Sequence, residues 1–428
     1  MKKMFLFFLA ILLFVGAALA ETQYSDGEKD AIPADRLKEE RNRVWQEYAD
    51  AMKQDPVLLE ETKNQAMTFE EATMRYSLEV VGEKPEDGYP VYIALHGGGA
   101  SDTPDINDQQ WEQMQYYYRM ALQCGVYVAV RGVRDTWDTH FNPESYPLYD
   151  RLIQYLILTQ EVNPNRIYLE GFSAGGDGVY AIAPRMADRF AAANMSSGHP
   201  NGVHFLNMRN LPIQLQAGEH DTAYSRNTVT VEYDTLLNEY QEKYGGFIHR
   251  TLIHFNAGHN YADYRTNKLL SMSNPQGWLA EGDRSYFSAD SFPPDYMDQF
   301  IRDPLPEKMI WQLDTRASRR SVESFYYLRA PYETTEGIVR IGYCPGENRI
   351  EIQTENLNGD FSILLNEDMI DFEQPVLFEL NGATVSLRVE PSMAVLKETT
   401  WERGDPNYQF EAEVSYGDLL EKLKEKSE

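Results

Sequence analysis

The chain has 428 residues, with 67 acidic and 39 basic side chains and a formal charge of -28. This balance excludes a nucleic-acid-binding role and disfavours binding to anionic lipid, because phosphate groups would be repelled. The length predicts one large domain and a smaller one, and two cysteines are too few for a disulfide scaffold.

The first twenty residues are typical of a cleavable secretory signal peptide. Lys2 and Lys3 precede a long apolar run, and Ala18-Leu19-Ala20 forms a small-residue site before Glu21. A membrane anchor is the alternative, which the polar, acidic sequence that follows disfavours. We expect cleavage after Ala20, a secreted or periplasmic protein without a membrane span, and a mature charge of -30, because the removed segment carries two lysines and no acid.

Cys124 and Cys344 lie far apart in the sequence. An exported chain could bridge them, but a buried thiol packs well as a small apolar group. We therefore predict that both are free.

The sequence predicts a helical N-terminal extension, followed by a long region in which strands and helices alternate. Residues 21–72 form an N-terminal extension with a helix over 34–52, since apolar residues there recur at helical spacing. Residues 73–306 alternate strands with helices, which implies a mostly parallel sheet covered on both faces. The predicted strands are 76–81, 91–95, 126–130, 166–170, 191–196, 213–217 and 247–255, and the helices are 111–122, 148–159, 174–183 and 226–244.

The sequence changes character after residue 306. Short strands are predicted at 338–343, 349–353, 361–365, 376–380 and 384–389. Asn381-Gly382 between the last two is a strong two-residue hairpin signal. Residues 307–428 are therefore predicted to be a smaller antiparallel β domain, closed by a helix over 417–426.

Gly171-Phe172-Ser173-Ala174-Gly175 directly follows the apolar strand at 166–170. A serine on a sharp strand-to-helix turn presents its hydroxyl to a substrate, and flanking glycines are needed because side chains would clash in the turn. Ser173 is therefore the candidate nucleophile, with a structural serine in a glycine turn as the alternative.

A serine nucleophile needs a base, an acid that orients the base, and donors for an oxyanion. The candidate base is His259, with His199 as the next loop histidine and His254 as a core residue. The candidate acid is Asp221, with Asp263 or Glu219 as alternatives. The oxyanion donors are predicted to be the N–H of Ala174 and that of Gly97 or Gly98, in the turn His96-Gly97-Gly98-Gly99.

The order of glycine turn, serine, aspartate and histidine resembles that of the α/β-hydrolase superfamily. Residues 73–262 are most similar to the secreted polyhydroxybutyrate depolymerase and feruloyl esterase branch, with its phospholipase and carboxylesterase relatives. The matching positions are His96 to Gly99, Gly171 to Gly176, Asp221 and Gly258-His259. The resemblance implies an α/β-hydrolase fold and a serine mechanism; the tail resembles small β-rich domains appended to secreted bacterial hydrolases.

Other loop residues at carboxyl ends of strands are candidates for substrate binding. Trp137, Asp138 and His140 follow the strand at 126–130, and His199 follows the strand at 191–196. The aromatic-rich segment 261–300 has no clear periodicity and could cover the site as a lid. The sequence carries no metal-binding signature and no phosphate loop, so no cofactor is expected.

These residues predict a serine hydrolase that cleaves carboxylic esters through an acyl-enzyme. The substrate would be an ester on a small molecule or a polymer, polysaccharide-linked esters included. A prolyl-oligopeptidase-like peptidase is the alternative within enzymes, although the chain lacks the long propeller usual there. From another class, the C-terminal domain could make the protein a glycan or polymer binder with an assisting hydrolase domain.

Overall fold

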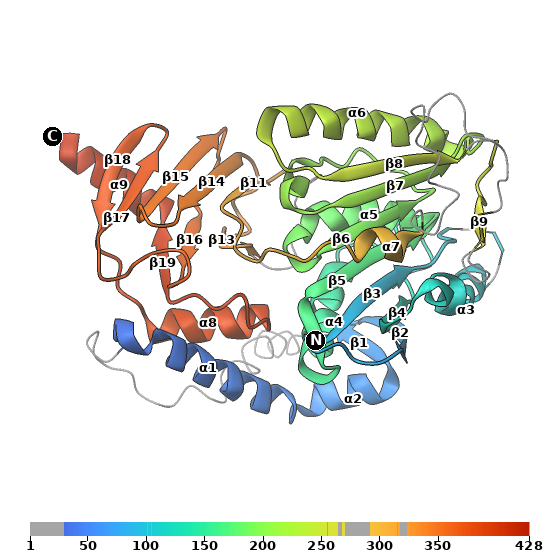
Figure 1. Ribbon diagram of the computed structural model, residues 1–428, viewed down its shortest axis with the longest axis horizontal. Coiled ribbons are helices and arrows are strands. Elements are labelled where there is room, and N and C mark those ends of the chain that lie inside the picture. The colour runs from blue at the N-terminus through green and yellow to red at the C-terminus, as the bar shows by residue number, and fades with distance from the viewer. Residues whose placement is uncertain are drawn as a thin grey trace, which may run out of the picture.

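The computed structural model describes residues 30–100, 102–103, 105–254, 256–263, 268–269, 292–314, 316 and 323–427. The predicted signal peptide and most of the predicted lid lie outside these ranges. A large sheet with its helices and a smaller β-rich part lie next to each other, and α1 (Leu37–Met52) and α8 (Met393–Arg403) pack along one side (Figure 1).

The large sheet has eight strands in the order β1-β2-β4-β3-β5-β6-β7-β8. The first two pairings are antiparallel and the remaining ones are parallel. The central strands β4, β6 and β7 are buried along their whole length and β3 along all but its first residue, as expected of a sheet covered on both faces. In chain order, the bounds of β1 to β8 are Ala66–Phe69, Ala72–Val81, Tyr89–Leu95, Gly125–Val130, Val162–Phe172, Ala192–Ser196, Ile213–Gly218 and His249–His254.

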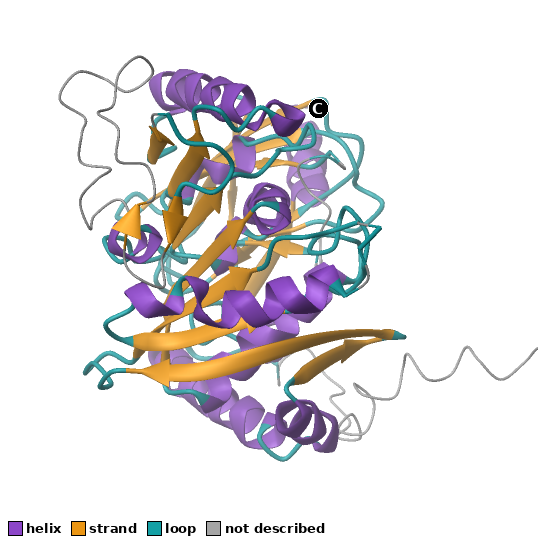
Figure 2. Ribbon diagram, turned by 90° about the vertical axis from the view of Figure 1, so that its right-hand side faces the viewer, coloured by secondary structure: helices purple, strands orange, loops and turns teal. Residues whose placement is uncertain are grey.

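Helices cover this sheet on both faces (Figure 2). Apolar residues of α4, α5 and α6 pack into one core cluster, and those of α3 and α7 pack into a second cluster on the opposite face. The bounds are Ile106–Tyr117, Ser145–Thr159, Ala174–Ile182, Arg226–Tyr244 and Pro293–Met297 for α3 to α7. The predicted α/β-hydrolase fold, with its mostly parallel sheet flanked by helices, is confirmed.

The C-terminal part contains two smaller sheets. One has the order β11-β14-β15-β17-β18 and the other β12-β13-β16-β19. Asn381 and Gly382 form the predicted hairpin turn between β17 and β18, both with positive φ. Bounds are Lys308–Gln312, Ser324–Phe325, Leu328–Arg329, Ile338–Cys344, Arg349–Glu355, Ser362–Leu365, Val376–Leu380, Ala383–Leu387 and Ala412–Ser415 for β11 to β19.

The C-terminal sheets are antiparallel, as predicted, except at one pairing, where β15 and β17 are parallel. They are parallel because the chain crosses to the other sheet as β16 before it returns. The elements that the sequence analysis did not predict include α2 (Pro56–Asn64), β1, which extends the main sheet, α8, and the short strands β11, β12, β13 and β19. The helix α9 (Tyr416–Ser427) matches the predicted terminal helix.

The two parts share one hydrophobic core. A single cluster of buried residues includes Val44 and Leu152 from the first part and Trp311, Phe325 and Phe378 from the second. The domain boundary near residue 306 stays a prediction, but the cores on its two sides are continuous. Cys124 and Cys344 are free, as predicted, although both are partly exposed rather than buried.

A cluster of buried charges joins the two parts, which we call the junction network. Arg403 donates to Asp188 and, through Nη1, to the Ser324 carbonyl, and Arg302 Nη2 donates to Asp405 Oδ2 over 2.7 Å. Each member is at most 4% exposed. The charges balance, three against three; the members are Asp150, Asp188, Arg189, Arg302, Arg403 and Asp405.

Candidate active site

Ser173 lies at the corner between β5 and α5, where the backbone is strained. Its φ of 59° and ψ of -120° are unfavourable for a residue with a side chain. Flanking glycines permit this turn, because a Cβ on Gly171 would lie 2.2 Å from the Gly175 carbonyl oxygen, and one on Gly175 would lie 2.0 Å from that of Leu95. The predicted elbow is therefore present, and it points a hydroxyl out of the sheet edge.

His259 and Asp221 lie next to Ser173 in the predicted order. His259 Nε2 is 3.0 Å from Ser173 Oγ, and His259 Nδ1 is 2.8 Å from Asp221 Oδ2. The Asp221 side chain is 1% exposed, whereas that of His259 is 34% exposed. The imidazole can thus exchange a proton with the hydroxyl on its open side while a buried carboxylate holds its other nitrogen.

The alternative base and acid residues occupy other positions. His254 stacks on Tyr261 with ring centroids 4.0 Å apart, and its Nε2 is 2.9 Å from Gln216 Oε1. Burial lowers the pKa of His254 to about 3. Glu219 accepts the N–H of Asn256 over 2.8 Å and so links the acid loop to the base loop. Asp263 lies in the short strand β9 (Ala262–Asp263).

The glycine turn after β3 reaches the elbow. A Cβ on Gly97 would lie 3.4 Å from the Ser173 Cβ, and Gly98 has a φ of 109°. Ala174 is the first residue of α5, so its N–H has no acceptor inside the helix. These positions suit the predicted oxyanion donors.

Asn107 holds the same turn and was not anticipated from the sequence. Its Oδ1 accepts the Gly99 N–H over 2.8 Å, and its Nδ2 donates to the Gly99 carbonyl over 2.9 Å. An asparagine just after a glycine run and at the start of a helix is a weak signal, because capping would explain it equally well.

His140 is placed differently from the prediction that it lines the substrate pocket. Its side chain is fully buried, its Nε2 lies 2.8 Å from the His96 carbonyl, and its Nδ1 lies 3.4 Å from the Tyr149 hydroxyl. His96 in turn accepts the Gly132 N–H over 3.0 Å. Burial lowers the pKa of His96 to about 4 and that of His140 well below its ordinary value, so both are neutral supports under the glycine turn.

The other predicted substrate-binding residues lie nearer the surface. Trp137 is 58% exposed, and its Cα would lie 3.7 Å from a Cβ on Gly99. Asp138 accepts the Thr136 hydroxyl over 2.6 Å within the same loop. His199 is half-buried, and its N–H donates to Asp177 Oδ1 over 2.7 Å. Trp137 thus flanks the glycine turn, Asp138 is bonded within its own loop, and His199 is bonded to α5.

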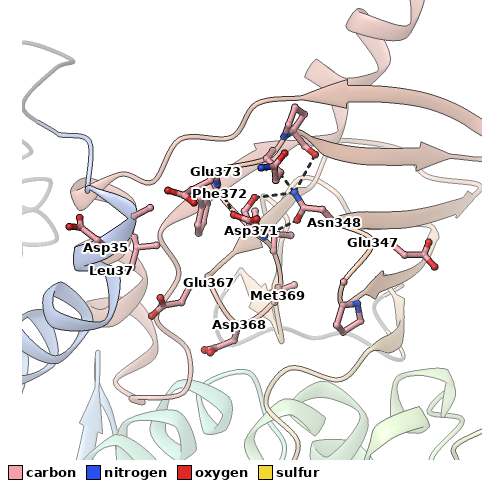
Figure 3. A pocket seen from close by; sticks show the side chains of 16 residues that line it. Asp35, Leu37, Glu347, Asn348, Glu367, Asp368, Met369, Asp371, Phe372 and Glu373 are labelled. Atoms are coloured by element: carbon pink, nitrogen blue, oxygen red, sulfur yellow. Dashed lines mark hydrogen bonds between the residues drawn. The ribbon is translucent and has the colours of Figure 1, made fainter.

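The chain has a hollow elsewhere, in the C-terminal part. It has a volume of about 860 Å³ and lies between the start of α1 and the loops around Asn348 and Asp371 (Figure 3). Asn348 Nδ2 donates to the Asp371 carbonyl over 3.0 Å, and this hydrogen bond connects two of these loops. The lining carries six carboxylates, at Asp35, Glu347, Glu367, Asp368, Asp371 and Glu373, and none of these belongs to the Ser173 site.

Within the described ranges, no group of three or more His, Cys, Asp or Glu side chains could hold a metal ion. The same part of the chain contains no helix that is both long and apolar enough to cross a bilayer.

The fold and this site define an α/β-hydrolase architecture with a serine, a histidine and an aspartate in contact at the carboxyl edge of its sheet. No protein-family model matches the chain, and no curated protein matches it.

Solved structures similar to the chain include several esterases. A thermostable esterase is 20% identical with a TM-score of 0.36, and the match covers 55% of this chain and 62% of that one. Esterase PE8 is 18% identical with a TM-score of 0.33, covering 44% and 92%. Est1E from Butyrivibrio proteoclasticus is 13% identical with a TM-score of 0.34, covering 47% and 92%.

Proposed function

We propose that the protein is a serine hydrolase that cleaves carboxylic esters. The observation that carries this proposal is the continuous contact from Ser173 Oγ through His259 to the buried Asp221, at 3.0 and 2.8 Å. A strained elbow and a glycine turn beside it supply the remaining parts of the machinery for acyl transfer.

In the proposed reaction, His259 Nε2 takes the proton from Ser173 Oγ as that oxygen attacks the ester carbonyl. The N–H groups of Ala174 and of Gly97 or Gly98 receive the oxyanion. His259 then gives its proton to the leaving alcohol, and water, activated by the same imidazole, releases the acid from the acyl-enzyme. Asp221 holds the imidazole in the required tautomer throughout.

Ser173→Ala tests the assignment. We expect the turnover of short-chain nitrophenyl esters to fall by about 1000-fold or more, with thermal stability unchanged, because the nucleophile is lost and the elbow keeps its shape. Ser225→Ala, which removes an exposed hydroxyl in the loop after Asp221, is the matched control and should keep full activity. If Ser173→Ala retains more than about one part in a thousand of the wild-type ester turnover, the proposal is wrong.

The substrate and location are part of the same proposal. Ester and amide versions of one substrate compare the esterase with the peptidase alternative: preference for the amide would favour the peptidase. A panel of free, polymeric and polysaccharide-linked esters then identifies the alcohol. We propose export through the N-terminal segment, so the mature protein recovered outside the cytoplasm should begin at Glu21.

A further inference from the structure

Arg226 lies beside the candidate triad on the side away from Ser173. It is the first residue of α6, the helix that packs against β7 and β8 (Figure 1). Its Nη1 is 3.9 Å from Asp221 Oδ1, while the other oxygen of that carboxylate faces His259. The Asp221 carboxylate is therefore held between a guanidinium and an imidazole.

The position of this arginine is unfavourable without such a partner. The first turn of a helix carries the positive end of its dipole, which favours acidic rather than basic side chains. Arg226 is also only 9% exposed, and a buried guanidinium requires a compensating negative charge. Asp221, shortly before it in the chain, lies within ion-pair distance and supplies that charge.

An aromatic ring and a backbone hydrogen bond flank this ion pair. The Arg226 guanidinium lies 4.9 Å from the centroid of the Tyr224 ring, which is on the solvent side and 76% exposed. The backbone fixes the same contact, since the Asn227 N–H donates to the Asp221 carbonyl over 3.1 Å. Partial exclusion of water strengthens an electrostatic interaction at this distance.

A second carboxylate faces Arg226 from α5. Asp177 is half-buried; burial raises its pKa, while the His199 N–H and the Arg226 charge oppose that rise. Among the described residues, Asp221 and Tyr224 lie against the arginine and Asp177 acts on it from α5, while His259 lies on the far side of the Asp221 carboxylate.

We propose that Arg226 is a positioning residue for the triad, which holds the Asp221 carboxylate in place and limits its attraction for a proton on His259. The inference rests on the proposed function. Without the positive charge, the unopposed carboxylate would favour the imidazolium, and a His259 that is already protonated cannot accept the proton of Ser173. Loss of the positive charge should therefore move the acid limb of the pH profile of kcat/KM upward.

The experiment compares pH profiles of nitrophenyl ester hydrolysis for the whole protein and its variants. In Arg226→Met we expect the acid limb to move up by about 0.5–1 pH unit, with activity at alkaline pH less affected. Arg226→Lys keeps the charge, so its acid limb should lie close to that of the wild type. Lys243→Met removes an exposed positive charge from the same helix and should leave the profile unchanged.

Tyr224→Ala keeps the test decisive if Arg226→Met does not fold, because it removes only an exposed ring. Water then reaches the guanidinium, and the acid limb should move in the same direction by a smaller amount. A wild-type protein without ester hydrolysis would overturn the proposed function. An active wild type with Arg226→Met and Tyr224→Ala profiles that superimpose on its own would overturn the role of Arg226 alone.

Discussion

The carboxylate of the candidate active site and those of the junction network are held in different ways. At the candidate site, buried Asp221 faces a histidine that remains one-third exposed, next to a serine with strained backbone angles. In the junction network, aspartates and arginines are enclosed together; Asp405 accepts from Arg302 and from the Asn407 N–H. Burial alone would raise the pKa of Asp405, but Arg302 and Arg189 hold it below the usual value.

The two regions differ in how far their charged groups are exposed to solvent. A network with its partners inside the fold is fixed in one geometry and is suited to joining two parts of a chain. The Ser173 site leaves two reacting groups accessible and places backbone strain beside them, which is typical of sites that act on a ligand. Substitutions at the Ser173 site should therefore lower activity, and substitutions in the junction network should lower stability.

Asp221→Asn should have the largest effect. The amide favours the wrong tautomer of His259, so kcat for ester hydrolysis should fall by about 10⁴-fold, roughly 5.4 kcal/mol of transition-state stabilisation. The melting temperature should change little compared with this loss. Steady-state kinetics and a thermal melt on the same sample measure both, and a fall in kcat of less than tenfold would contradict the assignment of the acid.

Arg403→Met should do the reverse. It leaves Asp188 buried without its guanidinium, so the free energy of unfolding should fall by about 3–5 kcal/mol in urea titrations. Ester turnover by the molecules that remain folded should stay within twofold. The double variant Asp188→Leu/Arg403→Met removes both charges and should recover part of the lost stability; an additive loss would show that the two residues do not act as a pair.

Glu170→Gln sharpens the comparison because Glu170 is a buried carboxyl without the arginine that the junction aspartates have. It is fully buried in β5, neither of its oxygens has a hydrogen-bond partner among the described residues, and burial raises its pKa well above the ordinary value. The folded state therefore binds a proton that the unfolded state releases above about pH 4.3.

The sign follows from that difference in protons bound: the contribution of Glu170 to stability is present below the unfolded value and is lost as pH rises. Glu170→Gln should match the wild type at pH 4 and be more stable at pH 8, by up to about 1.4 kcal/mol per pH unit crossed. Thermal melts across this range measure the effect. Glu239→Gln on the exposed face of α6 is the control, and parallel stability curves for Glu170→Gln and wild type would contradict the reasoning.

Much of the fold follows from local patterns. The run before Ser173, the glycines around it and the helix that follows are contiguous, so their conformations depend on neighbours in the chain. The same holds for Asn381 and Gly382, whose positive φ values the hairpin requires. The position of the histidine behind the glycine turn was less predictable: His140 follows a strand end as a ligand-binding residue would, yet it is buried against His96.

The sequence by itself determined the alternation of strands and helices, the order of Ser173, Asp221 and His259, and the hairpin, because periodicity, turn chemistry and strand ends are local properties. Only the tertiary structure decided which charges meet. Arg403 lies 215 positions from Asp188, and Arg302 lies 103 positions from Asp405. Pairing of buried charges depends on long-range packing, so the sequence does not indicate the partner of an arginine; the fold does.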